Sequence, residues 1–248
     1  MELKILNPQP RYRMVPFQEP SPNGYIHLAA AVRPPSGRVP RPGTGAGKQA
    51  LLARLKTLAH DLDDLGDVVK ATVYRAVVIP PVVTGYARIA AARPARYDVV
   101  VLVETATPDV IGAVEDSEPY RQMLQAVQGV TKDVHVMNAR CARRLGDVDK
   151  NRQGLFLFNY FVAEDPGVAL ELWEHLAGWF VVETGLDNST LLQPIGESAY
   201  TFVNHARWDV SFPRFAARAF AKPSFRSYVS ANLLLNRTGS MPAFYRLA

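Results

Sequence analysis

The sequence predicts an α+β protein made of two successive units, each with the element order β-α-β-β-α-β. One observation is a weak internal repeat. The segment RYDVVVLVETATPDVIGAVEDSEPYRQML resembles a later segment, AYTFVNHARWDVSFPRFAARAFAKPSFRSYV. Each segment is an apolar strand, a helix, a proline break and an aromatic–Arg pair, Tyr120–Arg121 or Phe225–Arg226. A second observation is that strand and helix patterns follow one another in the same order in both halves.

We expect the first unit at residues 25–146, after a Pro- and Asn-rich segment at 1–24 that is either an arm lying over the folded body or a partly ordered tail. A helix is predicted where leucines recur at three- and four-residue steps, at Leu51, Leu55, Leu58, Leu62 and Leu65. Strands are predicted at 25–34, 67–81, 97–105 and 133–145, a second helical pattern at 108–127, and loops at 34–48 and 82–96.

The second unit is expected at residues 153–248, after a polar linker. Its first helix begins at Pro166 and places Val168, Leu172, Leu176 and Phe180 on one face. Strands are predicted at 154–165, 189–196, 199–210 and 241–248, and a second helix runs from 212, breaks at Pro223 and continues through 224–234. This order is the ferredoxin-like motif in both units.

The central strand of the first unit predicts how the two units pack. Val99, Val101 and Val103 alternate with Val100 and Leu102, so this strand is apolar on both faces. The two helices of a ferredoxin-like unit cover one face of its sheet, and an apolar second face also needs a cover. The simplest cover is the other unit. We therefore predict two ferredoxin-like units packed sheet to sheet as a barrel within one chain.

Composition and charge exclude several function classes. The chain has 248 residues, 48% of them hydrophobic, and a formal net charge of +5. The positive excess lies in residues 1–150 without a dense basic run, so a nucleic-acid partner is not expected. No apolar stretch is long enough for a membrane helix, no secretory signal is present, and Cys141 is the single cysteine, so a cytoplasmic protein is expected. The five histidines show no metal-binding spacing, so no metal site is predicted: His27, His60, His135, His175 and His205.

One stretch of the second unit carries a family resemblance. It consists of FNYFVAEDPGVALELWEHLAGWFVVETG, a strand that ends in Arg207–Trp208, and a helix broken at Pro223–Arg226. These residues resemble the antibiotic biosynthesis monooxygenase (ABM) domain of the dimeric α/β-barrel superfamily. The first unit is a looser copy, with Glu104–Thr105 at the strand end and EPYRQML at the break. The resemblance implies a tandem repeat of this domain in one chain.

This resemblance also implies a function. The family includes cofactor-independent oxygenases that act on polyketide-type phenols and quinols, so we expect a monooxygenase-like oxidoreductase that needs no cofactor and takes a small apolar or aromatic molecule. Two alternatives stay open: a non-catalytic small-ligand-binding or structural barrel, and a haem-binding protein. The haem-degrading members carry a Trp and an iron-ligating His where this chain has Ala217 and Tyr228, so the sequence departs from their pattern. Assembly into a homo-oligomer is left open.

Asn159 and His205 are the predicted catalytic residues. Asn159 interrupts an apolar strand at the place where several family oxygenases have an Asn in their cleft. It either positions a substrate oxygen or bonds to neighbouring backbone at a bulge. His205 and Asn204 point to opposite faces of one strand. If His205 faces the cleft it supplies a general base, and otherwise it is a structural histidine.

The predicted substrate-binding residues are Asn204, Trp208, Tyr228 and Arg226. Asn204 and Trp208 share a strand face, and Trp208 is either a cleft residue or part of the core. Arg226 follows the proline break, where it either holds an anionic group or forms a salt bridge that fixes the repeat. The counterparts of Asn159, His205 and Trp208 in the first copy are apolar or acidic. This asymmetry places the predicted site in the second unit.

Overall fold

The computed structural model describes residues 2–35, 40–80 and 93–248. The predicted loops at 34–48 and 82–96 therefore lie partly outside the described residues, at 36–39 and 81–92. The first unit contains β1 (Gly24–Ala30), α1 (Ala46–Asp63), β2 (Val68–Val78), β3 (Val99–Thr105), the 3-10 turn η2 (Pro108–Val110), α2 (Ile111–Glu115), α3 (Glu118–Gln128) and β4 (Val134–Gly146). The second contains β5 (Leu155–Ala163), α4 (Pro166–Thr184), β6 (Ser189–Pro194), β7 (Phe202–Trp208), α5 (Phe212–Ala219), the π-helix η3 (Phe225–Ser230), α6 (Ala231–Leu235) and β8 (Thr238–Leu247).

The eight strands form a closed barrel in the order β1-β3-β2-β8-β5-β7-β6-β4. Within it each unit keeps the ferredoxin-like strand order, β4-β1-β3-β2 in the first and β6-β7-β5-β8 in the second. The prediction of an α+β barrel within one chain is confirmed. The units do more than cover each other's faces, because their edge strands also hydrogen-bond. β2 pairs with β8 and β4 pairs with β6, all antiparallel, so the barrel leaves no strand edge open.

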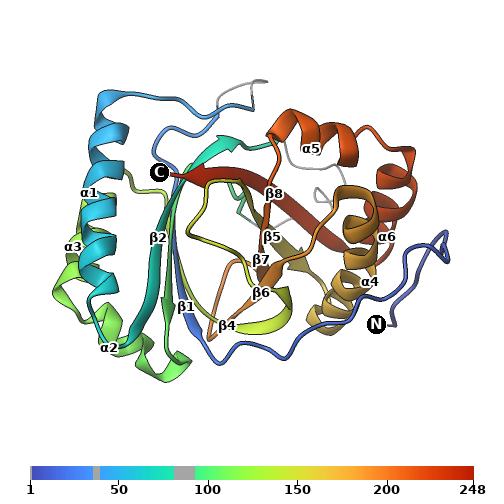
Figure 1. The fold of residues 1–248 in the computed structure, drawn as a ribbon, viewed down its shortest axis with the longest axis horizontal. Helices are drawn as coiled ribbons and strands as arrows, with labels where there is room; N and C mark the ends of the chain where they lie inside the picture. Colours follow the sequence, from blue (N-terminus) through green and yellow to red (C-terminus); the bar gives the residue numbers. More distant parts are fainter. Residues whose placement is uncertain (1, 36–39, 81–92) are drawn as a thin grey trace.

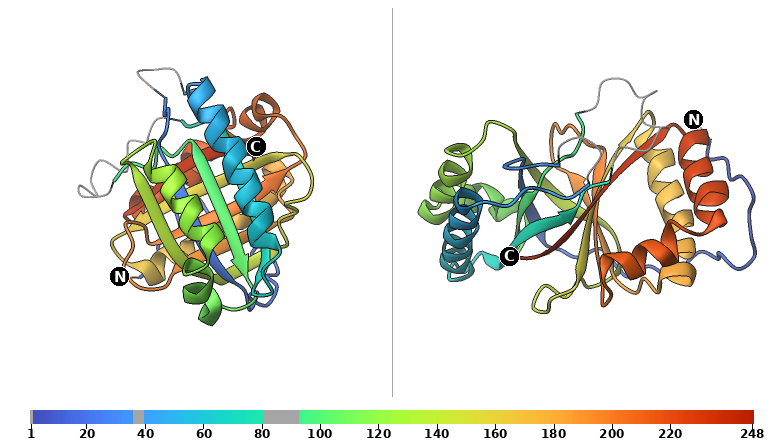
Figure 2. Two further views of the ribbon diagram at one scale, coloured as in Figure 1. Left: turned by 90° about the vertical axis from the view of Figure 1, so that its left-hand side faces the viewer. Right: turned by 90° about the horizontal axis from the view of Figure 1, so that it is seen from above.

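The strands are apolar on both faces, so the hydrophobic core consists of a barrel interior and two outer layers beneath the helices. Val100 and Leu102 face the barrel interior, which is packed with buried aromatic side chains. Val99, Val101 and Val103 face outward and pack against α1 and α3, together with the predicted leucine stripe. Helices α1, α2 and α3 lie on one side of the barrel, and α4, α5 and α6 lie on the opposite side (Figure 1, Figure 2). The site discussed below lies in this second helical layer.

Helix α4 is positioned by its ends. Its N-cap is Asp165, whose Oδ1 accepts hydrogen bonds from the backbone N–H groups of Gly167 at 3.0 Å and Val168 at 3.2 Å. Pro166 occupies the first turn, where a backbone N–H is not needed. The helix ends at Gly185, which adopts the left-handed conformation with φ 73°. These ends hold α4 over the outer face of the second sheet.

Two elements of the second unit differ from their predicted form. The helix predicted through 224–234 contains a π-helical stretch at Phe225–Ser230 before it becomes α6 at Ala231–Leu235. The last strand begins at Thr238 rather than at residue 241, because its pairing with β5 runs from Phe156–Tyr245 back to Ala163–Thr238. Both differences bring residues to the site that the sequence patterns did not indicate.

The arm at residues 2–23 crosses the helices of the second unit (Figure 1). Two buried asparagine side chains hold its backbone. Asn236 accepts from Lys4 N at 3.0 Å and donates to Lys4 O at 2.8 Å, and Asn232 does the same with Leu6 at 2.6 and 3.0 Å. Further along, the Tyr12 hydroxyl donates to Glu183 Oε1 at 2.8 Å. These hydrogen bonds fix the arm to α6 and α4.

No helix among the described residues is both long enough and apolar enough to cross a membrane.

Candidate functional site

A cavity of about 880 Å³ lies between the outer face of the second sheet and the helices that cover it. Its helical walls come from α4, from the end of α5, from the π-helix and from α6. Its floor comes mainly from alternate residues of three strands, as the period of two in a strand requires, together with Ser189 at the start of β6. The floor residues are Leu157, Asn159 and Phe161 of β5, Asn204 and Trp208 of β7, and Thr238, Ser240, Pro242 and Phe244 of β8. Volume and apolar lining are those of a small-molecule site.

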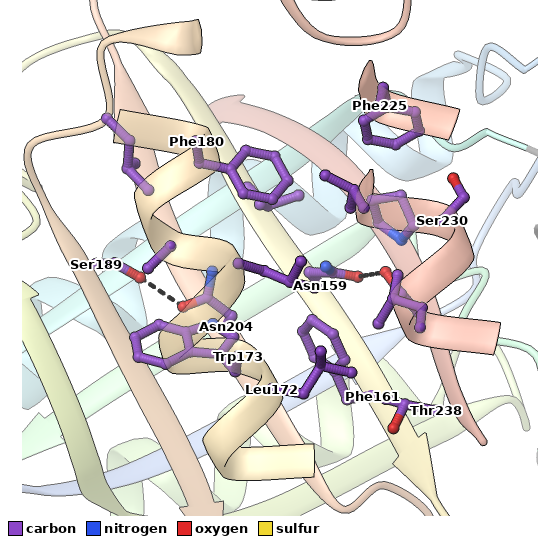
Figure 3. A pocket seen from close by; sticks show the side chains of 18 of the residues that line it. Asn159, Phe161, Leu172, Trp173, Phe180, Ser189, Asn204, Phe225, Ser230 and Thr238 are labelled. Atoms are coloured by element: carbon purple, nitrogen blue, oxygen red, sulfur yellow. Dashed lines mark hydrogen bonds between the residues drawn. The ribbon is translucent and has the colours of Figure 1, made fainter. Parts of the chain in front are cut away.

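Two asparagines face each other on this floor. Asn159 of β5 pairs directly with Asn204 of β7 in the antiparallel register, so their side chains leave the sheet side by side. The Ser240 hydroxyl donates to Asn159 Oδ1 at 2.8 Å, and the Ser189 hydroxyl donates to Asn204 Oδ1 at 2.5 Å. Figure 3 shows both carboxamides in the cavity, near Phe161, Leu172 and Trp173. The result is a polar row of four side chains across β6, β7, β5 and β8.

The hydrogen bonds from the two serines show which atoms the asparagines present to the cavity. With each Oδ1 engaged by a serine, the Nδ2 group of each amide is the part left for the cavity. In the described part of the chain neither Nδ2 hydrogen-bonds to the protein, and neither is sealed off from the cavity. Two amide donors therefore lie side by side in an otherwise apolar space, where a ligand oxygen can accept from both. The alternative of an Asn159 bonded to backbone at a bulge does not fit, because β5 pairs with β7 without a register shift.

His205 lies on the other face of β7, inside the barrel. Its ring stacks on Phe158 with the centroids 4.3 Å apart, Nδ1 lies 3.1 Å from Leu157 O, and Nε2 lies 3.2 Å from the Tyr74 hydroxyl. Burial lowers the pKa of His205 to about 3. The condition set for a general base, that His205 face the cleft, is not met, so the base assignment is corrected to a buried, neutral histidine of the barrel core.

Of the other predicted residues, Trp208 lines the cavity and Tyr228 does not. Trp208 lines the cavity and is also a core residue, since its Nε1 donates to Thr184 Oγ1 at 3.1 Å and its ring packs 4.7 Å from Phe215. Tyr228 does not line the cavity. It is buried beneath the N-terminal arm with its ring 5.1 Å from that of Tyr12, and burial raises the pKa of its phenol. Its assignment to substrate binding is therefore corrected.

Arg226 lines the cavity from the π-helix and is exposed. No carboxylate lies within ion-pair distance of it among the described residues. The salt bridge considered for this position is therefore not found, and Arg226 is a cavity-lining residue without a counter-charge among the described residues. Its neighbours Phe225, Val229 and Ser230 line the same wall. Wider helical turns of this kind are frequent at functional sites.

Sequence reasoning missed Ser189, Ser240 and the π-helical wall. Ser240 lies before the segment expected to form the last strand, so its face was not considered. No local signal marks it, because Thr238, Gly239 and Ser240 have little strand propensity and are held in the sheet by pairing with β5. Ser189 starts a strand that was expected, but the hydrogen bond that makes it relevant joins it to another strand.

A metal ion or a haem in this cavity would need ligating side chains. No group of three or more metal-ligating side chains occurs in the described residues. Of the described residues that line the cavity, none is a His, Cys, Met or Tyr, the side chains that ligate haem iron. Tyr228, which stands where the haem-degrading members have their iron-ligating His, does not line the cavity. The residues present do not fit a haem in this cavity.

No family model matches the sequence, and no curated protein matches it. Solved structures do match over nearly the whole chain. An anthrone oxidase-like protein is 12% identical, with 94% of each chain covered and a TM-score of 0.63. A candidate monooxygenase of Fusobacterium nucleatum is 6% identical, with 93% and 94% covered and a TM-score of 0.57. A protein assigned as a chlorite dismutase is 11% identical, with 91% and 95% covered and a TM-score of 0.50.

These likenesses concern the fold. Each covers both units of this chain and almost all of the compared chain, so the tandem dimeric α/β-barrel architecture is shared as a whole. At such low identity they do not transfer an activity, particularly since the compared proteins differ among themselves in chemistry.

Proposed function

We propose that the cavity binds a planar, fused-ring phenol or quinol and that the protein promotes its direct oxidation by dioxygen, as a cofactor-independent monooxygenase-like enzyme. The observation that carries this proposal is the pair of amide donors, Asn159 and Asn204, held side by side in an apolar cavity. Donors placed in a space that excludes water stabilise an oxyanion far better than water does. An electron-rich aromatic oxyanion is the form of a phenol that can pass electrons to dioxygen.

The chemistry can be written for an activated methylene flanked by aromatic rings, as in anthrone. The substrate loses a proton to water and becomes an enolate whose oxygen accepts from Asn159 and Asn204. One electron passes to dioxygen, and recombination of the radical pair forms a carbon–oxygen bond. The resulting hydroperoxide loses water and leaves a ketone. One oxygen atom ends in the product and the other in water, and all four electrons come from the CH2 group as it becomes C=O.

Two further observations support an aromatic substrate. The walls are rich in aromatic side chains, including Trp173, Phe180 and Trp208, which can stack on a fused-ring system. The fold is also that of an anthrone oxidase-like protein, and the sequence resembles the ABM domain in the same unit. A small aromatic molecule is therefore the partner that we propose for this site.

A non-catalytic ligand-binding protein is the second candidate. One observation favours it: among the described lining residues there is no carboxylate, histidine or tyrosine that could take the substrate's proton. In the oxidation above, the amide donors must therefore make the substrate acidic enough for water to act as the base. A binder needs no such step.

Anthrone and dioxygen provide the test. We expect the wild-type protein to accelerate oxygen uptake with one anthraquinone formed per dioxygen, and Asn159→Ala to lower kcat about 100-fold, as removal of an oxyanion donor does. Asn151→Ala changes an exposed asparagine outside the cavity and should leave kcat unchanged. Unchanged turnover in Asn159→Ala would contradict the role of the amide. Binding of anthrone and related phenols without any oxygen uptake would favour the ligand-binding protein.

A further inference from the structure

Arg226 is the one charged side chain among the described residues that line the cavity. The remaining lining is apolar, apart from the asparagine–serine row, Ser230 and Thr238. Among the described lining residues there is no aspartate or glutamate. These residues therefore contribute one positively charged side chain and two amide N–H donors to the cavity.

Two other arginines of the second unit, Arg207 and Arg237, are engaged in ion pairs. Arg207 reaches Asp209 at 2.5 Å, and Arg237 holds Glu164 at 2.6 and 2.7 Å. Arg226 forms no such pair within the described residues. Its charge is therefore available to a ligand and is not already neutralised.

The position of Arg226 also separates it from the asparagines. Asn159 and Asn204 rise from the sheet floor, whereas Arg226 belongs to the helical wall and is solvent-exposed. A ligand that fills the cavity can meet the amides with one end and the guanidinium with the other. Because Arg226 is exposed, solvent screens its charge in part, so its attraction for an anionic group should be modest and salt-dependent.

We infer that Arg226 selects ligands whose aromatic rings carry an anionic substituent, a carboxylate or a similar oxyanion, at the end that faces the helical wall. This inference rests on the proposed function, since it concerns the same cavity. The planar guanidinium offers two parallel N–H donors to a carboxylate, a geometry that a lysine cannot reproduce. The rings would lie among the aromatic side chains, and the acid group would lie at the rim.

A pair of probes that differ by one carboxylate tests this inference. The neutral probe is 2-naphthol, the anionic one is 6-hydroxy-2-naphthoate, and binding is measured by isothermal titration calorimetry at neutral pH and low salt. We expect the naphthoate to bind about fivefold more tightly than the naphthol, as for one partly exposed ion pair. Arg226→Ala should remove this preference and leave naphthol affinity within about twofold. Raising the salt concentration should reduce the preference in the wild-type protein.

Two control variants sharpen the test. Arg218→Ala removes an exposed arginine of α5 that does not line the cavity, and it should keep the full preference. Arg226→Lys keeps the positive charge but loses the two parallel N–H donors of the guanidinium, and it should retain part of the preference for the naphthoate.

The possible failures are distinct. If the folded wild-type protein binds both probes equally, or if Arg226→Ala weakens both equally, the inference is wrong while the proposed cavity function stands. If neither probe binds, both are overturned.

Discussion

Asn159 and Asn204 face each other across β5 and β7, and the carboxamide oxygen of each accepts a hydrogen bond from a serine hydroxyl on the next strand outward. A carboxamide has two ends of similar shape and opposite hydrogen-bonding character. In the structure each serine hydroxyl donates to the oxygen end, which leaves the Nδ2 end toward the cavity. We expect Ser189 and Ser240 to act on a ligand indirectly, by favouring this orientation of each amide.

The first prediction concerns these serines. In Ser240→Ala the Asn159 amide can turn either way, so the fraction of molecules with Nδ2 toward the cavity falls to about half. The affinity for 2-naphthol then falls about twofold. In the double variant with Ser189→Ala the loss becomes about fourfold. Titration calorimetry measures both values. Ser230→Ala is the control, since Ser230 lines the cavity but bonds to neither asparagine. Equal affinities for all variants would show that the amides hold their orientation without the serines.

The second prediction concerns pH. Burial lowers the pKa of His205 to about 3 and that of His135 to about 4, and it places the pKa of His27 well below its usual range. The unfolded chain takes up protons near pH 6.5 while the folded chain does not. Stability is therefore complete above pH 6.5 and falls as the pH is lowered toward 3 to 4, by about 1.4 kcal/mol per pH unit for each histidine.

Urea unfolding between pH 7.5 and 4.5 measures this slope. His205→Gln should reduce it by one histidine's share, whereas His60→Gln, which changes an exposed histidine of α1, should reproduce the wild-type slope. A slope in His205→Gln that matches the wild type would mean that His205 is protonated in the folded protein.

The third prediction concerns the contact between the arm and α4. A Cβ atom added at Gly178 would lie 2.3 Å from the carbonyl oxygen of Arg13, so Gly178→Ala must displace the arm. We expect a lower melting temperature and faster proteolysis within residues 2–20, despite the better helix propensity of alanine. Gly47→Ala makes the same exchange in α1 where nothing lies within 4 Å, and it should be neutral or stabilising. An unchanged Gly178→Ala protein would show that the arm is not held against α4.

Much of the fold could be predicted because its signals are local. The leucine stripe of α1, the Pro166 start of α4 and the two-sided β3 are each readable from a few neighbouring residues, and their order indicates the barrel. The joining of β2 to β8 depends on edges far apart in the sequence, and no local pattern reports it. The π-helix is equally hidden, because its apolar spacing is compatible with an α-helix.

The site was only half predictable for a related reason. Asn159 stood out as a polar residue in an apolar strand, and its face could be extended to Asn204 by counting. His205 stood out equally well, but counting alone could not say which face of β7 is inside the barrel. Ser240 was lost because the start of β8 has little strand propensity, being Thr-Gly-Ser, and is held in the sheet by its pairing with β5.

Joining both halves of the barrel in one chain has a consequence for stoichiometry. Two identical subunits would carry two identical cavities, because symmetry repeats every substitution. In this chain the halves have diverged: the outward-facing pairs across β1 and β3 are Ile26–Val103 and Leu28–Val101, packed into the core beneath α1 and α3. The first half has apolar pairs at the positions where the second half has Asn159 and Asn204. A saturating titration should therefore reach one ligand per chain.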